Sequence, residues 1–326
     1  MEPIFSCPAC SNIDIEIYST YTTKSAGERN LLKCKVCNKI FSETNSTAMF
    51  QVNTEISKIA SCIKLRSEGL GQRATARVLG IHKNTVKAWE DKFSSLKDTL
   101  KAYLFCHEFV KLTFEGDEVY TRVKSNKPAH ESEGWTAILM ERGSRYILES
   151  KCGFKDEELF KSVIKDLAKM AEKTNDLTLL TDGERRYSKI LFELCNEKIS
   201  TKGNRKKVLT EGIKVRLKNK GGKKAQKYEK PVPEHPNTED IEESEIHANH
   251  LEAKNSTLRR TNSAFRRRTN TYAKNVSGLQ RTLDLDFIVH NYLKPNFTTK
   301  IVPAVALGII KEPYSIEKVL MMQRIA

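Results

Sequence analysis

The fold is decided by the stretch Glu115-Gly116-Asp117-Glu118-Val119-Tyr120-Thr121-Arg122-Val123, a strand-like segment interrupted by acids. Two more strand-like runs, an amphipathic helix and a buried strand that ends in an acid follow, at residues 135–140, 144–149, 156–173 and 177–182. Alternating or continuous apolar residues mark the strands, and apolar residues at helical spacing mark the helix. This part of the chain therefore predicts an α/β domain.

Three strands, a helix and a fourth strand are the order of a ribonuclease H-like α/β fold. Asp117 falls inside the first strand and Asp182 at the end of the fourth. An acid in an apolar strand is unfavourable unless a metal, a proton or a partner compensates it. A third acid, Glu252, lies in a long basic helix at 246–260, and Arg259 follows two turns later on the same face, where it could hold a phosphate.

Three carboxylates that converge on two Mg²⁺ ions would suit phosphoryl transfer, because one ion activates the attacking oxygen and the other stabilises the leaving one. Mg²⁺ prefers oxygen ligands, which acids supply. Each acid also has an ordinary structural interpretation. Asp117 could be an edge-strand charge, with Glu115 or Glu118 equally placed. Asp182-Gly183 is a common turn signal, and Glu252 could be a surface charge of a helix.

Two cysteine pairs near the N-terminus, Cys7-Pro8-Ala9-Cys10 and Cys34-Lys35-Val36-Cys37, are separated by 23 residues. Two residues between thiolates allow both to bind one tetrahedral Zn²⁺ from a tight turn. Strand-like runs at 13–18 and 29–34 suit a small β-ribbon that carries the second pair. The alternative is a redox dithiol or unrelated cysteines. The other four cysteines are interpreted as isolated, buried apolar residues: Cys62, Cys106, Cys152 and Cys195.

Residues 53–96 are typical of a helix-turn-helix. A first amphipathic helix ends near Gly69, a second spans 72–79, Gly80 supplies the turn, and a third begins at Ile81. The third helix would offer five polar residues to the DNA major groove: His82, Lys83, Asn84, Thr85 and Lys87. The alternative is a three-helix bundle that does not contact DNA.

The 326-residue chain has a net charge of +15, which favours attraction to phosphate polymers and does not indicate a fold. Residues 201–230 are strongly basic, include a fifth candidate strand within 208–217, and give way to an acidic stretch at 239–245. This insertion is either a solvated segment or a flexible phosphate clamp. Five arginines near the third acid suggest a path for DNA: Arg259, Arg260, Arg266, Arg267 and Arg268. His247 and His250 flank the same acid and are not assigned to a metal. The chain lacks a secretory signal and a long apolar run, so we expect a cytoplasmic protein without a membrane partner.

The chain resembles the transposases of the insertion-sequence-one family, which carry an Asp-Asp-Glu triad. The matching segments are residues 117–120, 181–183 with Tyr187, 252–259, and 302–308 after His290-Asn291-Tyr292. The first is an Asp-Glu pair followed by an apolar and an aromatic residue, and the third is a Glu followed by Asn, Thr or Ser, Leu and Arg. The resemblance also covers the cysteine and helix-turn-helix segments. The three parts lie in one uninterrupted chain here, whereas some members of the family split them across a programmed frameshift.

The resemblance implies a multidomain transposase that binds the ends of its own insertion sequence, cuts DNA and joins it to a target. It implies that Asp117, Asp182 and Glu252 bind Mg²⁺ or Mn²⁺, and that the protein works on double-stranded DNA at the nucleoid of a prokaryote as a homodimer or larger assembly. The expected parts are a zinc ribbon, a helix-turn-helix domain, a ribonuclease H-like domain with a basic insertion, and a tail, at residues 1–48, 53–100, 108–310 (insertion 201–245) and 311–326. The main alternative is a DNA-binding regulator without enzymatic activity, or a decayed transposase. A nuclease of the resolvase type is a weaker option, because it would not join a 3′-end to target DNA.

Overall fold

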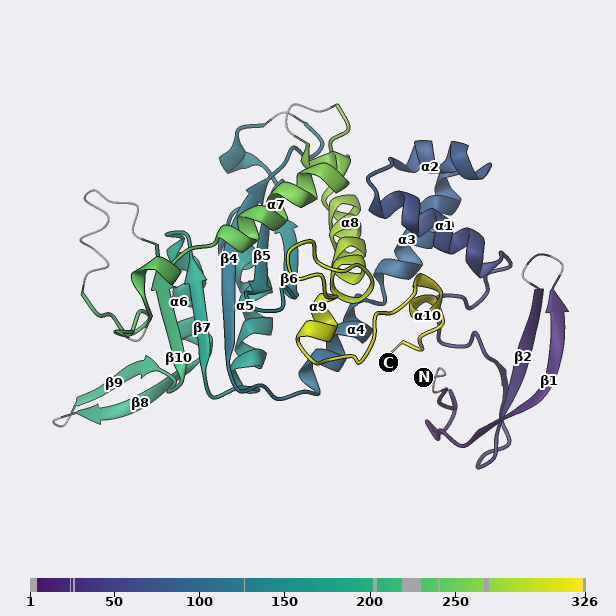
Figure 1. Ribbon diagram of the computed structural model, residues 1–326, viewed down its shortest axis with the longest axis horizontal. Coiled ribbons are helices and arrows are strands. Elements are labelled where there is room, and N and C mark those ends of the chain that lie inside the picture. Colours follow the sequence, from purple (N-terminus) through teal and green to yellow (C-terminus); the bar gives the residue numbers. More distant parts are fainter. Residues whose placement is uncertain are drawn as a thin grey trace.

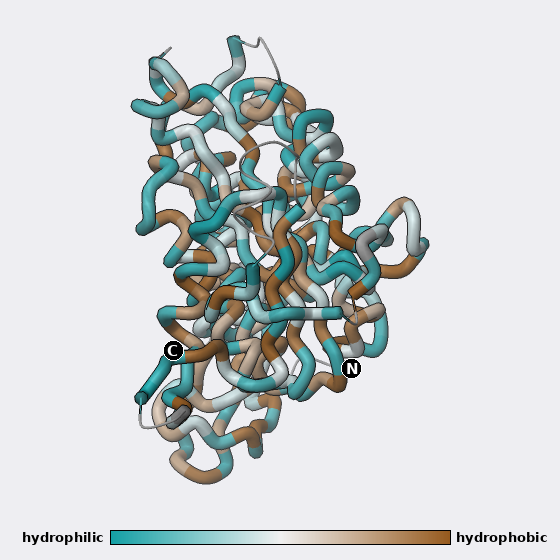
Figure 2. Tube along the Cα trace, turned by 90° about the vertical axis from the view of Figure 1, so that its left-hand side faces the viewer, coloured by the Kyte–Doolittle hydropathy of each residue, from teal (hydrophilic) through white to brown (hydrophobic). Residues whose placement is uncertain are grey.

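The computed structural model describes residues 5–324 apart from positions 24, 26, 126, 202–203, 219–229, 240 and 267–269. The described elements form a small antiparallel sheet, a group of helices, and a mixed five-stranded sheet packed with helices (Figure 1). Figure 2 shows apolar segments running through the middle of the molecule, with hydrophilic segments around them. Within the described ranges, no helix combines the length and the apolar character that crossing a bilayer requires.

The N-terminal sheet consists of β1 (Ile15–Thr23), β2 (Gly27–Cys34) and β3 (Ile40–Ser42), antiparallel and in that order. Both strands of the expected ribbon are present, and they extend further towards their shared turn than the sequence pattern indicated. The buried members of the hydrophobic cluster in this sheet are few: Cys7, Leu32, Cys34 and Phe41. A core of this size stabilises a sheet weakly, so the ribbon needs a cross-link.

Four helices follow, α1 (Ile56–Ser67), α2 (Gln72–Leu79), α3 (Lys83–Ser94) and α4 (Lys97–Phe105). Gly80 ends α2 with a φ of 62°, so the turn expected at this glycine is present. The third helix was expected from Ile81 but begins at Lys83. The chain is still extended at His82, whose side chain accepts a hydrogen bond from the Asn84 N–H and caps the helix. Apolar periodicity did not indicate α4, because much of the face that it buries is polar.

The larger sheet has the order β10-β7-β4-β5-β6. Its strands are β4 (Leu112–Tyr120), β5 (Trp135–Glu141), β6 (Ile147–Gly153), β7 (Leu177–Thr181) and β10 (Ile213–Leu217). β5 is antiparallel to β4 and to β6, whereas β7 is parallel to β4 and to β10. The third strand was expected at 144–149 but starts at Ile147, because Arg145 turns the chain with a φ of 67°.

Helices cover both faces of this sheet. α5 (Glu157–Ala171) and α6 (Arg185–Leu194) lie on one face and α7 (Asn249–Thr261) on the other, while α8 (Val276–Ile288) runs along the outer edge of the sheet beside β6 (Figure 1). Neighbouring residues of β4 show the two sides, because successive side chains in a strand point to opposite faces. A Cβ on Gly116 would contact Tyr187 of α6, whereas Asp117 is hydrogen-bonded to Asn255 of α7.

The outer edge of β6 is covered by two amide side chains that sequence patterns did not reveal. Asn291 accepts a hydrogen bond from the Ile147 N–H and donates one to the Ile147 carbonyl, at 2.9 and 2.8 Å. Gln280 pairs in the same way with the Cys152 N–H and the Ser150 carbonyl, both at 3.0 Å. Because unpaired edge groups attract other strands, these amides close the sheet on this side.

The remaining elements are short. They are the hairpin strands β8 (Asn196–Thr201) and β9 (Asn204–Leu209), the 3-10 turns η1 (Ala129–Glu131), η3 (Glu243–Glu245) and η4 (Ser263–Phe265), the π-helix η5 (Val289–Leu293), and α9 (Pro303–Ala306) and α10 (Ile316–Leu320). Of the candidate strand at 208–217, only residues 213–217 join the large sheet. Residues 208 and 209 end the β8–β9 hairpin instead.

A buried ionic network joins α4 to the sheet, to α5 and to α8. Glu149 of β6 is fully buried and accepts hydrogen bonds from Lys97 and Lys101 of α4. Lys97 also reaches Asp284 of α8 at 2.8 Å, and Lys101 reaches Asp166 of α5 at 2.6 Å. Burial disfavours the charged carboxylate, but Lys97 and Lys101 outweigh it and lower the pKa of Glu149 to about 2.

Replacing Glu149 by Gln should lower the free energy of unfolding by about 3 kcal/mol, because two buried ammonium groups lose their shared anion. Urea unfolding at neutral pH measures this loss. The matched control is Glu157→Gln at a surface pair with Lys161, which should change the free energy by less than about 1 kcal/mol. Equal losses in the two variants would contradict the network.

The same network makes a prediction for acid. The pKa of Glu149 is depressed in the folded state, so its contribution is present above the ordinary value of 4.5 and is lost as pH falls towards 2. The difference in unfolding free energy between wild type and Glu149→Gln should therefore shrink below about pH 4.5. A difference that does not change down to pH 3 would show that the variant acts through packing instead.

Candidate functional site

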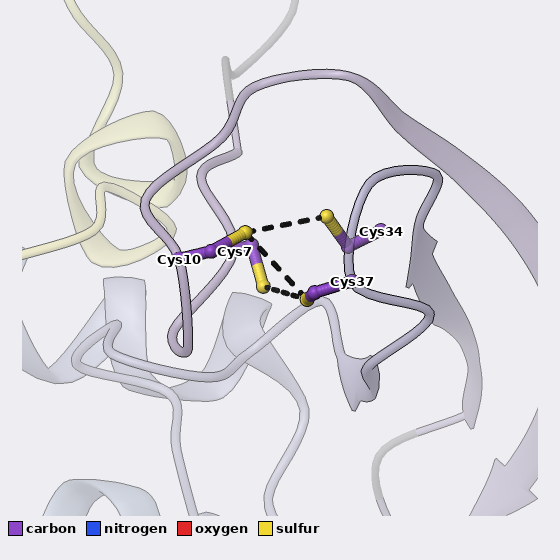
Figure 3. A group of neighbouring side chains, drawn as sticks. All are labelled: Cys7, Cys10, Cys34 and Cys37. Carbon is purple, nitrogen blue, oxygen red and sulfur yellow. Dashed lines mark hydrogen bonds between the residues drawn. The ribbon is translucent and has the colours of Figure 1, made fainter.

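Four cysteines come together at the N-terminal sheet, as the sequence predicted (Figure 3). Cys7 and Cys10 precede β1, Cys34 ends β2, and Cys37 lies in the following turn. Their sulfur atoms lie within 4.8 Å of one another, and the pairs Cys7–Cys37, Cys10–Cys37 and Cys10–Cys34 are 3.5, 3.5 and 3.6 Å apart. A tetrahedral Zn²⁺ with Zn–S bonds of about 2.3 Å requires sulfur separations of about 3.8 Å. The cluster is therefore consistent with a structural zinc site.

In the first knuckle, Cys7 favours a thiolate, whereas at Cys10 the Asn12 N–H is outweighed by burial and the neighbouring thiols, which raise the pKa of that thiol to about 12. The Ala9 N–H points at the Cys7 sulfur at 3.4 Å. Burial opposes ionisation of Cys7, but the N–H groups of Ala9 and Cys10 outweigh it and lower the pKa of this thiol to about 7.

Outside the cluster, Cys62 is buried, Cys152 and Cys195 are half-buried and Cys106 is exposed. The expectation that all four are buried is confirmed for Cys62, is met only in part at Cys152 and Cys195, and was wrong for Cys106. Its position one residue beyond α4 leaves it at the surface.

The candidate acids come from three elements. Asp117 is in β4, Asp182 follows the last residue of β7, and Glu252 is in the first turn of α7. β4 and β7 are parallel, and their register pairs Gly116 with Thr181. The residues that follow this pair, Asp117 and Asp182, therefore lie at the same end of the two neighbouring strands.

The pKa of Asp117 is affected by the neighbouring acids. Burial, followed by the negative charges of Glu118, Asp182 and Glu252, raises the pKa of Asp117 to about 6 from an ordinary value of 3.8. Its carboxylate accepts a hydrogen bond from the Asn255 amide at 2.8 Å. Within the described residues, neither Asp117 nor Glu252 forms an ion pair with a Lys, Arg or His. Asp117, Asp182 and Glu252 thus lie close enough to interact electrostatically, although their carboxylate oxygens do not all come within 4.8 Å of one another.

The two neighbouring acids of β4 have cationic partners. Glu115 is fully buried and contacts Arg142 at 2.8 Å, His250 at 2.7 Å and the Leu251 N–H at 3.0 Å. Glu118 pairs with Lys155 at 2.9 Å from the other side of the strand. Sequence patterns left these three positions equivalent, whereas the contacts distinguish Asp117 from both neighbours.

Glu115 positions the helix that carries Glu252. It binds the side chain and the backbone of residues in the first turn of α7, two positions along β4 from Asp117. Glu115, His247 and His250 bring possible ligand atoms within 4.8 Å. The Arg142 guanidinium already neutralises Glu115, and Arg142 also donates to the Glu245 and His247 carbonyls. We therefore interpret this group as a set of contacts that holds the N-terminal end of α7 against β4.

The five residues predicted to contact DNA lie at and just after the start of α3. His82, Lys83, Asn84 and Lys87 are exposed and Thr85 is half-buried, whereas Val86 and Trp89 are buried on the opposite face. Lys87 also pairs with Asp91 at 2.7 Å. The later part of α3 packs against α8, where Arg281 contacts Glu90 and Asp91. The polar end of α3 is thus accessible while its other end is fixed.

The predicted arginine path is described in part. Arg259 is half-buried on α7, Arg260 and Arg266 are exposed, and Arg267 and Arg268 lie outside the described residues. Most of the basic stretch that follows β10 also lies outside them, so the expected clamp at 218–230 is not described beyond its two ends. The contact of Asn255 with Asp117 was not predicted from the sequence. The spacing of three residues between Glu252 and Asn255 places both on one side of a helix, and this was the signal available.

The sequence matches no known family model, and no curated protein matches it.

Proposed function

We propose that this protein is a DNA transposase that binds the ends of its own insertion sequence, cleaves DNA and joins a 3′-end to a target. The observation that carries the proposal is the raised pKa of Asp117 beside Asp182 and Glu252, with no cation paired to Asp117 or Glu252 among the described residues. Negative charge that no cation pairs with, as at Asp117 and Glu252, favours bound metal ions, which would supply positive charge. Segments that resemble the insertion-sequence-one transposases contain all three acids.

The sheet supports the same proposal. Its order β10-β7-β4-β5-β6, with only β5 antiparallel to the rest, agrees with the ribonuclease H-like arrangement expected from the sequence. We assign residues 108–310 to this catalytic domain, 53–100 to a helix-turn-helix domain and 1–48 to a zinc ribbon, followed by the tail at 311–326. The accessible polar residues at the start of α3 would then contact DNA, as expected for a recognition helix.

The residues present fit Mg²⁺ or Mn²⁺. The donor set consists of carboxylate oxygens, which suit hard divalent ions, and the Oδ1 atom of Asn255 is buried beside Asp117 without a hydrogen-bond partner. When bound, the ions would activate a water or a 3′-hydroxyl and stabilise the leaving oxygen.

The chain's own residues prepare this site. Asp117, Asp182 and Glu252 would hold the ions. Asn255 orients the Asp117 carboxylate through its amide, and Glu115 fixes the start of α7, the helix turn that carries Glu252. Arg259, two turns after Glu252, would hold a phosphate of the DNA. Assembly as a dimer or larger is part of the proposal, since two DNA ends must be held together.

The test is a strand-transfer assay with purified protein, Mg²⁺, labelled DNA that carries the ends flanking its gene, and a plasmid target. We expect joined product from the wild type and roughly a thousandfold less from Glu252→Gln, because phosphoryl transfer depends on the full metal set. Binding of the end DNA should change little in this variant.

Glu158→Gln is the control, since this exposed acid of α5 lies on the other side of the sheet and should leave product unchanged. Specific binding of end DNA without any joined product would favour a DNA-binding regulator or a decayed transposase. Product that persists in Glu252→Gln would remove Glu252 from the metal set.

A further inference from the structure

A cavity of about 620 Å³, lined by both polar and apolar groups, lies along α7 next to the face that carries Glu252. Its walls are α7, α8 with η5, the end of α1, and the loop at 294–298. One end is closed where Gly69 meets the last turn of α7. A Cβ at Gly69 would lie 2.7 Å from the Thr261 carbonyl oxygen, and its φ of 88° also favours glycine. The cavity has the size of a small-molecule or nucleotide site.

The charged side chains of this cavity that lack an ion-pair partner among the described residues are cationic. Its two buried or half-buried acids are neutralised by the protein, because Asp286 pairs with Lys254 at 2.8 Å and Glu90 binds Arg66 and Arg281. Among the described residues, Arg145 and Arg260 form no ion pair, and both line the cavity. The Arg260 guanidinium donates a hydrogen bond to the Thr257 hydroxyl, one turn back on its own helix, at 3.1 Å. Two guanidinium groups in one cavity favour a phosphate.

An aromatic ring lies at the same cavity. Phe297 lines it and is 87% exposed, although an exposed Phe gains nothing from the hydrophobic effect. The Lys300 ammonium lies 4.1 Å from the centre of the ring. Exposed aromatic rings beside basic groups are the elements that bind single-stranded nucleic acid, because bases stack on the ring while cations follow the backbone.

We propose that this cavity binds an unpaired nucleotide of single-stranded DNA, with its phosphate at Arg145 and Arg260 and its base stacked on Phe297. The inference rests on the proposed transposase function. Ala253, Ser256 and Arg260 line the cavity and follow Glu252 at helical spacing on the adjacent side of α7. A strand that leaves the three acids therefore reaches the cavity by crossing one helix, so the site holds an unpaired nucleotide next to the point of cleavage.

The test measures fluorescence anisotropy of a labelled oligothymidylate of about ten nucleotides, within the usual site sizes for single strands, against full-length protein in EDTA. Phe297→Leu keeps an apolar side chain and removes the stacking surface, so it should weaken binding roughly 5- to 100-fold. Arg145→Gln should reduce the slope of log affinity against log salt by about 0.7, the value for one phosphate contact to a single strand. Binding of duplex end DNA should stay within about twofold in both variants, because phosphate contacts elsewhere dominate it.

The matched control is Phe154→Leu, an identical change at another exposed Phe, beyond the end of β6, which does not line the cavity. Unchanged oligothymidylate binding in Phe297→Leu, or equal losses in Phe154→Leu, would overturn the inference. Because EDTA removes divalent metal ions, this binding assay tests the cavity independently of the metal-dependent strand transfer. If the protein carries out strand transfer but Phe297→Leu does not change its affinity for single strands, only the cavity proposal is wrong. If single-strand binding depends on Phe297 but no strand transfer is found, only the enzymatic proposal is wrong.

Discussion

Asp117→Asn should abolish strand transfer and, in the absence of divalent metal, make the protein harder to unfold. The variant keeps the shape of the side chain and its contact with Asn255 but removes a charge that burial and the other acids disfavour. If Asp117 is a ligand of the proposed metal ions, its loss should reduce product by roughly a thousandfold or more. A substitution that inactivates an enzyme while stabilising its fold is the signature of a strained active site.

The stability gain has a definite dependence on pH. The pKa of Asp117 is raised from 3.8 to about 6 in the folded state. The stabilisation from its neutral form is therefore complete below about pH 3.8 and is lost as pH rises through 6. One pKa unit corresponds to about 1.4 kcal/mol, so above pH 6 the Asn variant should exceed the wild type by up to about 3 kcal/mol. Near pH 4 the two proteins should unfold alike.

Thermal unfolding with and without Mg²⁺ completes this test. Mg²⁺ should raise the melting temperature of the wild type, because a ligand that binds only the folded state stabilises it. It should have little effect on Asp117→Asn. Glu158→Gln, at an exposed acid on α5, should retain the wild-type response. A lower melting temperature for Asp117→Asn, together with lost DNA binding, would mean that this acid supports the fold and does not bind metal.

Local patterns predicted the parts of the fold that depend on local sequence. Apolar periodicity found most strands and α5, since each buries one or both faces in a regular repeat. The paired cysteines were found because two thiolates on one turn have a characteristic spacing. The start of the third strand was misplaced because the turn at Arg145 depends on backbone conformation, which residue type does not reveal.

Contacts between distant residues could not be predicted in this way. Glu115 and Asp117 share one strand and one face, and only the position of α7 shows that Glu115 binds Leu251 while Asp117 faces the other acids. The helix α4 was not predicted for a related reason. Its buried lysines have the sequence pattern of surface residues, and only their contacts with Glu149 show that they are buried. In both cases a charged residue takes its role from a partner far along the chain.

Cys34→Ser should remove bound zinc and unfold the N-terminal sheet while leaving the larger sheet intact. Cys34 is fully buried and ends β2. It is one of the four cysteines of the cluster and one of the four buried residues in the hydrophobic core of this sheet. Apparent binding free energies of structural zinc reach about 10–16 kcal/mol, far more than so small a core supplies. Metal content should fall from about one zinc ion per chain to near zero, and limited proteolysis should cut within β1–β3.

The same variant connects the ribbon to DNA. If the ribbon helps to hold the transposon end, affinity for end DNA should fall with zinc content, whereas Mg²⁺ should still raise the melting temperature through the separate acidic site. Cys106→Ser, at an exposed cysteine outside the cluster, is the control and should change neither property. Unchanged zinc content in Cys34→Ser would contradict the four-cysteine site. Lost zinc with unchanged end binding would limit the ribbon to a structural role, because the sheet would then be dispensable for recognition even though the metal folds it.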